Sequence, residues 1–209
     1  MRAKTKPVPA ENRSFAETAR RAQIAGCAID AIAEMGFANA SVDQIAKRAG
    51  VSKGVITYHF PSKEEIVNAV IEKVVAAGRA YMEPRIMAER SRTGRLRAYI
   101  ECGLEFIGAN RKAVIALVEI ATSARRPDGS PVTGLALLAQ RAVEFEELLR
   151  AGQRSGEFRQ FDTRVMALTI IQAIDAVPPL LAREPNLNLE LHAKELATIF
   201  ALATRKQSS

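Results

Sequence analysis

Apolar side chains recur at intervals of three and four residues along most of the chain, the spacing that gathers them on one face of an α-helix. Glycine, proline and short polar clusters separate these runs and mark helix ends and turns. No segment alternates apolar and polar residues as a half-buried strand does, and the chain has no internal repeat. The pattern therefore predicts an all-α protein of about nine helices.

The expected helices differ in character. The one linking the two halves of the chain should end before Pro84. The helix after Asn110, which can cap it, is apolar almost all round, so we expect it to be buried in the middle of its domain. By residue number the nine are expected at about 15–35, 41–50, 52–60, 63–81, 96–110, 111–122, 135–152, 162–177 and 189–203.

Residues 41–63, SVDQIAKRAGVSKGVITYHFPSK, form a pattern of helix, tight turn and helix. Ser41 and Ser52 stand where a side-chain oxygen would cap each helix, and Gly50 can adopt the left-handed conformation between them. Because Ile56 and Phe60 are spaced to point inward, the second helix keeps an outward face rich in hydrogen-bond donors. That face suits a DNA groove and carries Lys53, Thr57, Tyr58 and His59.

This stretch resembles the N-terminal domain of the tetracycline-repressor (TetR) family of bacterial transcription regulators. The spacing is kept without insertion from Ile24 to Val70, roughly the first third of the chain. The sequence departs from the family pattern at Ile56-Thr57. This departure affects which bases the helix would recognise, but not its expected role of entering a DNA groove. The matching residues are Glu34-x-Gly36-Phe37, Ser41-Val42-x-x-Ile45-Ala46, Ala49-Gly50-Val51-Ser52-x-Gly54, Tyr58-x-x-Pro61 with Phe60, and Ser62-Lys63-Glu64.

The resemblance implies a symmetric homodimer that reads a palindromic operator in double-stranded DNA, most simply a repressor released when a small-molecule effector binds. It divides the chain into a basic arm (1–14), a helix-turn-helix domain (15–62) and an effector-binding and dimerisation domain (63–209). The arm is expected to be disordered, either as a solvated leader or as a minor-groove contact. Candidate DNA-binding residues are Ser41, Ser52, Lys53, Thr57, Tyr58, His59 and Lys63, the last placed to favour a phosphate at a helix N-terminus.

Charge and cysteine content agree with a DNA-binding protein of the bacterial cytoplasm. The net charge is +7, and residues 1–80 carry 12 basic and 8 acidic side chains, so the excess is concentrated around the motif. Two distant cysteines, Cys27 and Cys102, indicate buried, reduced thiols. We expect neither a signal peptide nor a membrane span, because the most apolar segment, residues 165–181, contains Gln172, Asp175 and two prolines.

Catalytic equipment is lacking in the sequence. Only His59 and His192 are present, without the motifs of metal or nucleophilic catalysis, so we expect no enzyme, no metal and no cofactor. Two alternatives stay open: an all-α protein-interaction module that does not read DNA, and a helical ligand-binding enzyme that keeps only a vestige of the motif.

Three polar residues stand within apolar runs: Glu119, Gln172 and Asp175. A buried carboxylate needs a partner, which can be an internal group, a second subunit or a ligand. For the effector pocket, among the helices between residues 63 and 152, the candidate lining residues are Phe106, Glu119 and Phe145, a set that favours a flat or aliphatic molecule bearing a cation or a donor.

The last two long helices carry more apolar surface than one subunit would cover. A pair from each subunit would form a four-helix interface. The candidate interface residues are Met166, Ile170, Ile174, Leu189, Leu196 and Phe200.

Overall fold

The computed structural model describes residues 10–125, 128–130, 132 and 134–206. The regular elements within these residues are helices joined by turns and loops, and an isolated bridge joins Phe158 to Arg205, so the all-α prediction is confirmed. The described residues contain one helix more than the nine predicted, because the sequence pattern did not separate the short helix α9 from its neighbour. The helices are α1 (Ala10–Asn39), α2 (Val42–Ala49), α3 (Lys53–His59), α4 (Lys63–Ala88), α5 (Arg92–Ala109), α6 (Arg111–Ser123), α7 (Leu135–Arg154), α8 (Thr163–Asp175), α9 (Val177–Arg183) and α10 (Leu189–Thr204).

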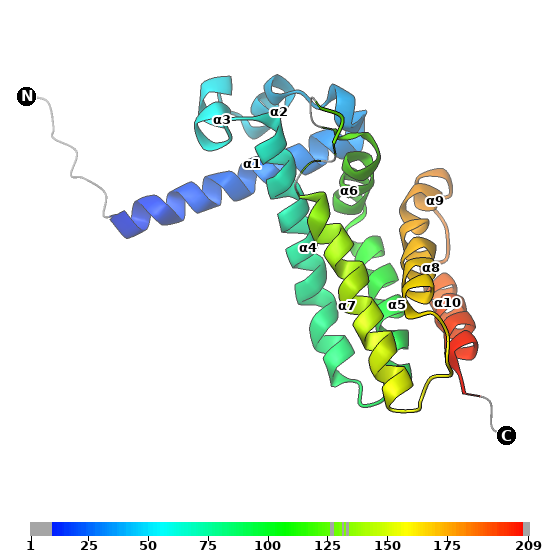
Figure 1. The fold of residues 1–209 in the computed structure, drawn as a ribbon. Coiled ribbons are helices and arrows are strands. Elements are labelled where there is room, and N and C mark those ends of the chain that lie inside the picture. Colours follow the sequence, from blue (N-terminus) through cyan, green and yellow to red (C-terminus); the bar gives the residue numbers. More distant parts are fainter. Residues whose placement is uncertain (1–9, 126–127, 131, 133, 207–209) are drawn as a thin grey trace, which may run out of the picture.

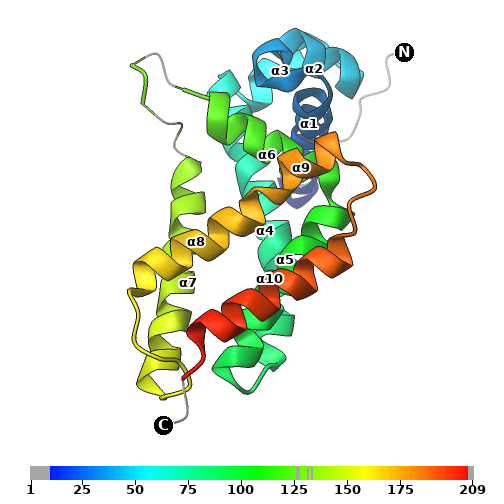
Figure 2. The ribbon, with the colours of Figure 1, turned by 90° about the vertical axis from the view of Figure 1, so that its right-hand side faces the viewer.

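The helices form two bodies that share α4 (Figure 1). α2 and α3 lie at one end of the molecule against α1, and α4 runs from them along the length of the second body beside α5 and α7. α8 packs on α7 and α10 packs on α5, so α8 and α10 lie together on one outer face (Figure 2). One continuous set of buried apolar side chains runs from Ile24 in α1 to Phe200 in α10.

Helix ends in the N-terminal part follow the predicted caps. The side-chain oxygens of Ser41, Ser52 and Ser62 accept hydrogen bonds from the third residue after each, at 3.2, 3.4 and 3.2 Å. Gly50 has a φ of 66°, and its N–H bonds back to the end of α2. Gly36 has a φ of 78° and interrupts the helical backbone of α1, so the break predicted there is confirmed.

Two helix boundaries differ most from the prediction. α1 begins at Ala10, so the last residues of the predicted arm are helical, while residues 1–9 lie outside the described part. α4 continues through Pro84 to Ala88. Proline removes one backbone hydrogen bond, but Ala80, whose carbonyl loses its donor, is exposed to water, and Arg85 donates to the carbonyl of Tyr81 at 2.8 Å.

The apolar sequence of α6 predicted a place in the middle of the second body, and this prediction is wrong. The helix packs along α1 at the junction between the two bodies, and only part of its surface is buried. The side chain of Asn110 does not cap α6; it donates instead to the carbonyl of Phe106 at 3.0 Å, at the end of α5. An apolar helix can therefore mark a contact between two bodies as well as the centre of one.

The apolar segment Thr163–Leu181 is long and apolar enough to cross a membrane by length and composition alone, which is weak evidence because the core helix of a soluble protein passes the same test. In the fold it is divided between α8 and α9, and Pro178-Pro179 fall in the first turn of α9. Ile170, Ile174 and Val177 of this segment are buried against the rest of the protein.

Gly152, near the end of α7, provides a test of how tightly the second body is packed. A Cβ at this position would lie 2.1 Å from Cδ2 of Phe158, whose ring is buried. We expect Gly152→Ala to lower the free energy of unfolding by about 1–3 kcal/mol, because the ring has to move within a close-packed core.

Thermal unfolding followed by circular dichroism measures the effect, and about 2–4 °C in Tm corresponds to each kcal/mol in a chain of this size. Gly26→Ala is the matched control. It lies within helix α1 with nothing within 4 Å of the new Cβ, so it should raise Tm slightly. A Gly152→Ala protein as stable as the wild type would contradict the packing described here.

Candidate nucleic-acid interface and effector region

The outward face of α3 is exposed to solvent. Tyr58 is 78% exposed, and Lys53 and Thr57 lie beside it on the same short helix. The opposite side is anchored by Ile56 and Phe60, which are buried against α1 and α2. The hydroxyl of Thr57 donates to the carbonyl of Lys53 or Gly54, so it offers a methyl group and an acceptor, and no free donor, to a neighbouring surface.

The remaining predicted contact residues are more constrained. Ser41 and Ser52 use their hydroxyl oxygens as helix caps. Lys53 pairs with Asp43 at 2.9 Å, but both side chains are well exposed, and such pairs contribute only about 0–1 kcal/mol. A phosphate can therefore compete for the ammonium of Lys53.

His59 faces inward more than the sequence predicted. Its ring is half-buried, and within the described residues its Nδ1 has no hydrogen-bond partner. Its carbonyl accepts a hydrogen bond from Arg21, whose guanidinium also lies 4.1 Å from the centre of the Phe60 ring. Arg21 thus links the end of α3 to α1. The sequence pattern did not predict this role.

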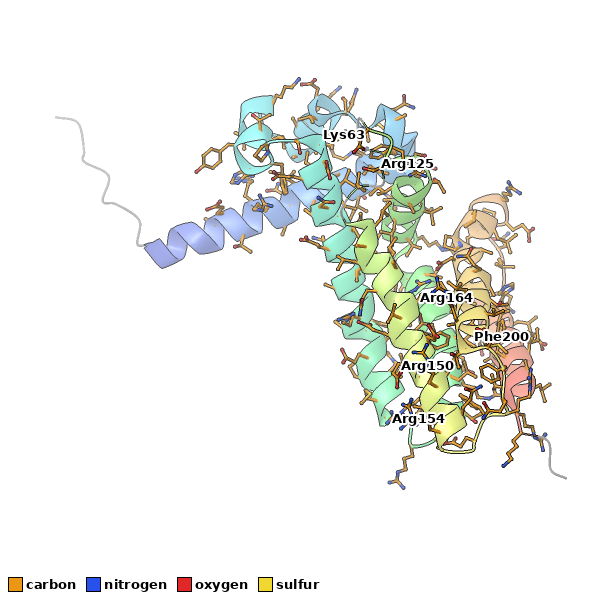
Figure 3. The ribbon with its side chains drawn as sticks, viewed as in Figure 1. Lys63, Arg125, Arg150, Arg154, Arg164 and Phe200 are labelled. Carbon is orange, nitrogen blue, oxygen red and sulfur yellow. The ribbon has the colours of Figure 1, made fainter. Side chains whose placement is uncertain are left out.

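The structure corrects the interpretation of Lys63. Its ammonium donates to the carbonyl of Phe37 at 2.8 Å and lies 4.3 Å from the centre of that residue's ring. Burial lowers the pKa of Lys63. Its charge is therefore directed into the domain and not toward a phosphate, close to the junction of α1, α2 and α4 (Figure 3).

Glu119 is also placed differently from the prediction. Its Oε2 accepts a hydrogen bond from the backbone N–H of Phe37 at 3.3 Å, so it bridges α6 to the turn before α2. This is the internal hydrogen bond left open as an alternative to a ligand contact. The sequence could not bring residues 37 and 119 together because no local pattern links them.

The other two predicted pocket residues lie in the packed interior of the second body. The Phe106 ring is 5.9 Å from that of Tyr81, and the Phe145 ring is stacked on Tyr99 at 4.0 Å. Phe106, Glu119 and Phe145 are absent from the lining of the two cavities described below.

A polar cluster lies beside this stack, with one member each from α5, α7 and α8. Arg141 donates to both carboxylate oxygens of Asp175 at 2.8 Å, which confirms the internal pair considered for that residue. Burial raises the pKa of Tyr99 to about 12. Within the described part, Nε of Arg141 is buried without a partner. Gln172 is exposed on α8.

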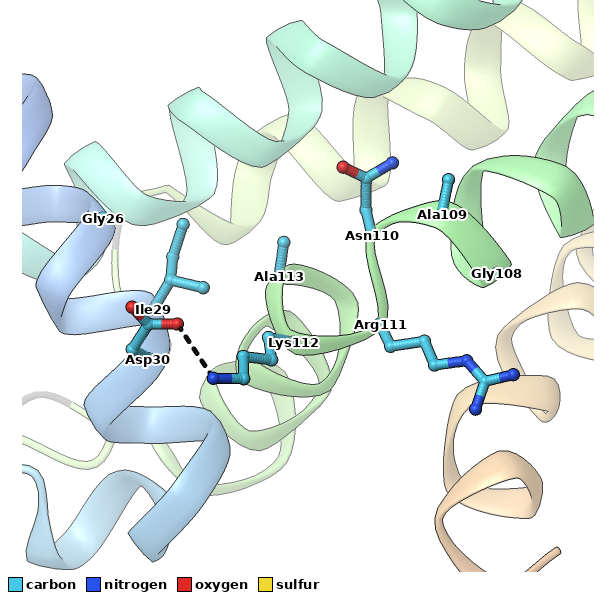
Figure 4. Close-up of a pocket in the computed structure, with 9 residues that line it drawn as sticks. All are labelled: Gly26, Ile29, Asp30, Gly108, Ala109, Asn110, Arg111, Lys112 and Ala113. Atoms are coloured by element: carbon cyan, nitrogen blue, oxygen red, sulfur yellow. Dashed lines mark ion pairs between the residues drawn. The ribbon is translucent and has the colours of Figure 1, made fainter. Parts of the chain in front are cut away.

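The larger cavity is an open cleft of about 550 Å³ between α1 and the turn that joins α5 to α6 (Figure 4). Lys112 stands at its edge, 3.6 Å from Asp30 and 3.0 Å from Glu34. Arg48 also pairs with Glu34. The hydrogen bonds from these two cations, of which the one from Arg48 has the larger effect, lower the pKa of Glu34 to about 2. The cleft borders the ionic contacts between α6 and α1.

The outer face of α8 and α10 exposes large apolar side chains, but not those predicted for a dimer interface. Ile170, Ile174 and Phe200 point into the subunit, and Met166, Leu189 and Leu196 are half-buried. Three of the six predicted interface residues are thus buried within the subunit, because the inward and outward apolar stripes of such a helix look alike in sequence. A groove of about 350 Å³ beside Phe161, Met166 and Phe200 lies on this face. The exposed side chains are Val165, Leu168, Leu191, Ile199 and Leu202.

Comparison with known proteins supports the assignment of the N-terminal region. Residues 27–70 match the family model of bacterial regulatory proteins of the tetR family. The HTH-type transcriptional regulator RutR of Escherichia coli strain K12 is 40% identical over 63 residues, which are 30% of this chain and 30% of RutR. The sequence match thus spans less than a third of that relative.

Similarity of fold extends much further. FadR from Bacillus subtilis in complex with stearoyl-CoA has a TM-score of 0.75 at 23% identity, covering 86% of this chain and 97% of FadR. AibR in complex with isovaleryl coenzyme A and operator DNA has a TM-score of 0.75 at 18% identity, with the same coverage. The N-terminal helix-turn-helix segment, residues 27–70, thus has the sequence pattern of the tetR family of bacterial regulatory proteins, and the whole chain has a fold similar to that of FadR and AibR.

Proposed function

We propose that the protein is a ligand-responsive transcriptional regulator of the cytoplasm, a homodimer that represses from a palindromic operator and is released by a small molecule. The observation that carries this proposal is the exposed face of α3, with Lys53, Thr57 and Tyr58 standing above a buried Ile56. Residues 15–62 form the DNA-binding domain in this proposal, and residues 63–209 form the effector-binding and dimerisation domain.

α3 is the recognition helix of the proposed complex. Its seven residues reach into a major groove, where Thr57 and Tyr58 meet base edges and Lys53 leaves Asp43 for a phosphate. Ser41, Ser52 and His59 border this helix and complete the contact set. The aromatic ring of Tyr58 has few contacts within the subunit, which suits a residue that becomes buried only when DNA binds.

The first test uses a palindromic duplex selected by the wild-type protein from a random pool. Affinity should fall steeply as salt rises, with log K decreasing by about 0.9 per log unit of salt for each phosphate neutralised. Thr57→Ala should change the preferred bases at one position and cost up to about 1–3 kcal/mol in affinity for the selected site.

Thr122→Ala is the control, because Thr122 is another exposed helical threonine whose hydroxyl bonds back to its own helix, far from α3 in sequence. An affinity that does not depend on salt would contradict DNA binding and favour the protein-interaction module.

A second copy of the chain is the proposed occupant of the outer α8 and α10 face. Val165 and Leu202 are each 62% exposed and Ile199 is 53% exposed, on two helices that lie side by side. Two such helices from each subunit form a four-helix contact that removes these side chains from water. Each subunit then presents one recognition helix, and the pair reads a site with two-fold symmetry.

Leu168→Glu combined with Ile199→Glu should convert the dimer into monomers, because each copy would place two unpaired carboxylates in an apolar contact. Light scattering measures the mass, and circular dichroism confirms that the helices remain. Val143→Glu adds a charge at an exposed apolar position of α7 and should leave the dimer intact. A double mutant that stays dimeric would exclude this face.

An acyl-CoA thioester is the proposed class of effector, on the basis of the ligands seen with FadR and AibR. An acyl chain that enters the second body between α4, α5 and α7 meets the rings of Phe106 and Phe145. Glu119 leaves the proposed lining set because its carboxylate is engaged by Phe37. The polar cluster of Tyr99, Arg141 and Asp175 borders the same region and can meet the polar end of a ligand.

Isovaleryl-CoA and stearoyl-CoA are the probes for this proposal. A ligand that binds the folded protein raises Tm by mass action, and one that favours the DNA-free conformation lowers operator affinity. Linkage requires operator to weaken ligand binding by the same factor, so both affinities should be measured, each with and without the other partner. Free coenzyme A is the control. Equal ligand affinity with and without operator would exclude this form of regulation.

A further inference from the structure

The turn between α1 and α2 is held from two sides through a single residue. Gly36 breaks α1 with φ 78° and ψ 159°, and Phe37 follows it. The backbone N–H of Phe37 donates to Glu119 of α6, and its carbonyl accepts from Lys63 at the start of α4. Both polar groups of this residue's backbone are therefore bonded to side chains from other helices.

The two partners are suited to hold this backbone in place. A carboxylate that accepts from N–H and an ammonium that donates to C=O make charge-assisted hydrogen bonds, which are stronger than neutral ones. Glu119 and Lys63 are both half-buried. A Cβ at Gly36 would lie 3.5 Å from Oε2 of Glu119, so the carboxylate is in contact distance of the break itself.

α6, which carries Glu119, packs on α1 and also contacts α4, α5 and α9 of the second body. Ala116 and Ile120, which neighbour Glu119 on α6, are fully buried, so the backbone that carries Glu119 is held in a packed part of the structure. Within the described residues, the ion pairs between α6 and the first body join Lys112 to Asp30 and Glu34, and they are weak because the Lys112 side chain is 61% exposed. The hydrogen bond from Phe37 to Glu119, in contrast, links α6 to the backbone of the turn.

A displacement at Phe37 would be passed to the DNA-binding helices. The carbonyl of Gly36 accepts from the N–H of Ala40 at 3.2 Å, and Ser41 then caps α2. α2 in turn packs on α3. The orientation of the recognition helix is therefore fixed by a turn whose backbone is bonded to α4 and α6.

We infer that Glu119 and Lys63 are positioning residues for DNA binding, which act through the backbone of Phe37 and do not touch DNA. The inference rests on the proposed DNA-binding function. It assigns Lys63 an internal role in place of a phosphate contact, and it makes α6 the element through which the second body sets the affinity of the first.

Two variants of Glu119 distinguish its role as a hydrogen-bond acceptor from the role of its negative charge. Glu119→Gln keeps an oxygen that can accept from Phe37, so its affinity for the duplex selected by the wild type should stay within about threefold. Glu119→Met has a similar length but no comparable acceptor, so we expect about a tenfold loss, which corresponds to 1.4 kcal/mol and is typical of a lost charge-assisted bond. Equal affinities for wild type and Glu119→Met would overturn the inference, as would an equal loss in both variants.

Salt dependence distinguishes the two roles of Lys63. Lys63→Met should weaken binding while the slope of log K against log salt stays that of the wild type. A slope smaller in magnitude by about 0.9 would mean that one phosphate contact has been lost and would overturn the positioning role. Lys53→Met, at the exposed position on α3, is the matched control that should reduce the slope.

Hydrogen exchange supplies a readout that does not require DNA. The amide of Phe37 should exchange faster in Glu119→Met and at the wild-type rate in Glu119→Gln, while amides in α7 are unchanged. Equal Phe37 exchange in wild type and Glu119→Met would show that the contact is absent in solution and overturn the inference. If the wild-type protein selects no duplex, both the proposed function and this inference fail. If the wild-type protein binds DNA and the Glu119 variants bind it with the same affinity as the wild type, this inference fails while the proposed function stands.

Discussion

The shared burial of α1 is the constraint on which the rest of the structure depends. A unit of three short helices has too little interior to be stable alone, because small domains bury a smaller fraction of their surface. One face of α1 covers α2 and α3, and another packs on α6 and α4. Ile24, Ala28 and Ile32 on α1 therefore belong to the same continuous core as Ile120 on α6. The two bodies cannot move apart without exposing that core.

This shared core limits the ways in which a signal can pass between the two bodies. Close-packed helices shift as rigid pieces, so a change in the second body reaches α1 through α4 and α6. The proposed regulatory mechanism needs no long-range disorder, because a displacement of α6 acts directly on the turn at Gly36. At this junction the half-buried Lys63 donates to the backbone carbonyl of Phe37.

The apolar surface of the chain is divided between two uses. In α8 and α10, the inward stripe, with Ile170 and Phe200, completes the subunit, while the outward stripe, with Val165 and Ile199, stays in water. A helix that is apolar on both sides has to be covered on both sides. In the proposed dimer, a second copy covers the outer stripe, and the same contact fixes the spacing between the two recognition helices.

The sequence by itself determined the helices, because caps, breakers and three- and four-residue spacing are local. Ser41, Ser52, Gly36 and Gly50 act as their positions predicted, and the exposed face of α3 could be recognised from Ile56 and Phe60 alone. Tertiary structure alone decided which face of an apolar helix is inside and what each polar side chain meets. Glu119 and Phe37 are 82 positions apart, and α6 packs on α1 and not at the centre of the second body. Such contacts depend on how whole helices pack, which no local spacing encodes.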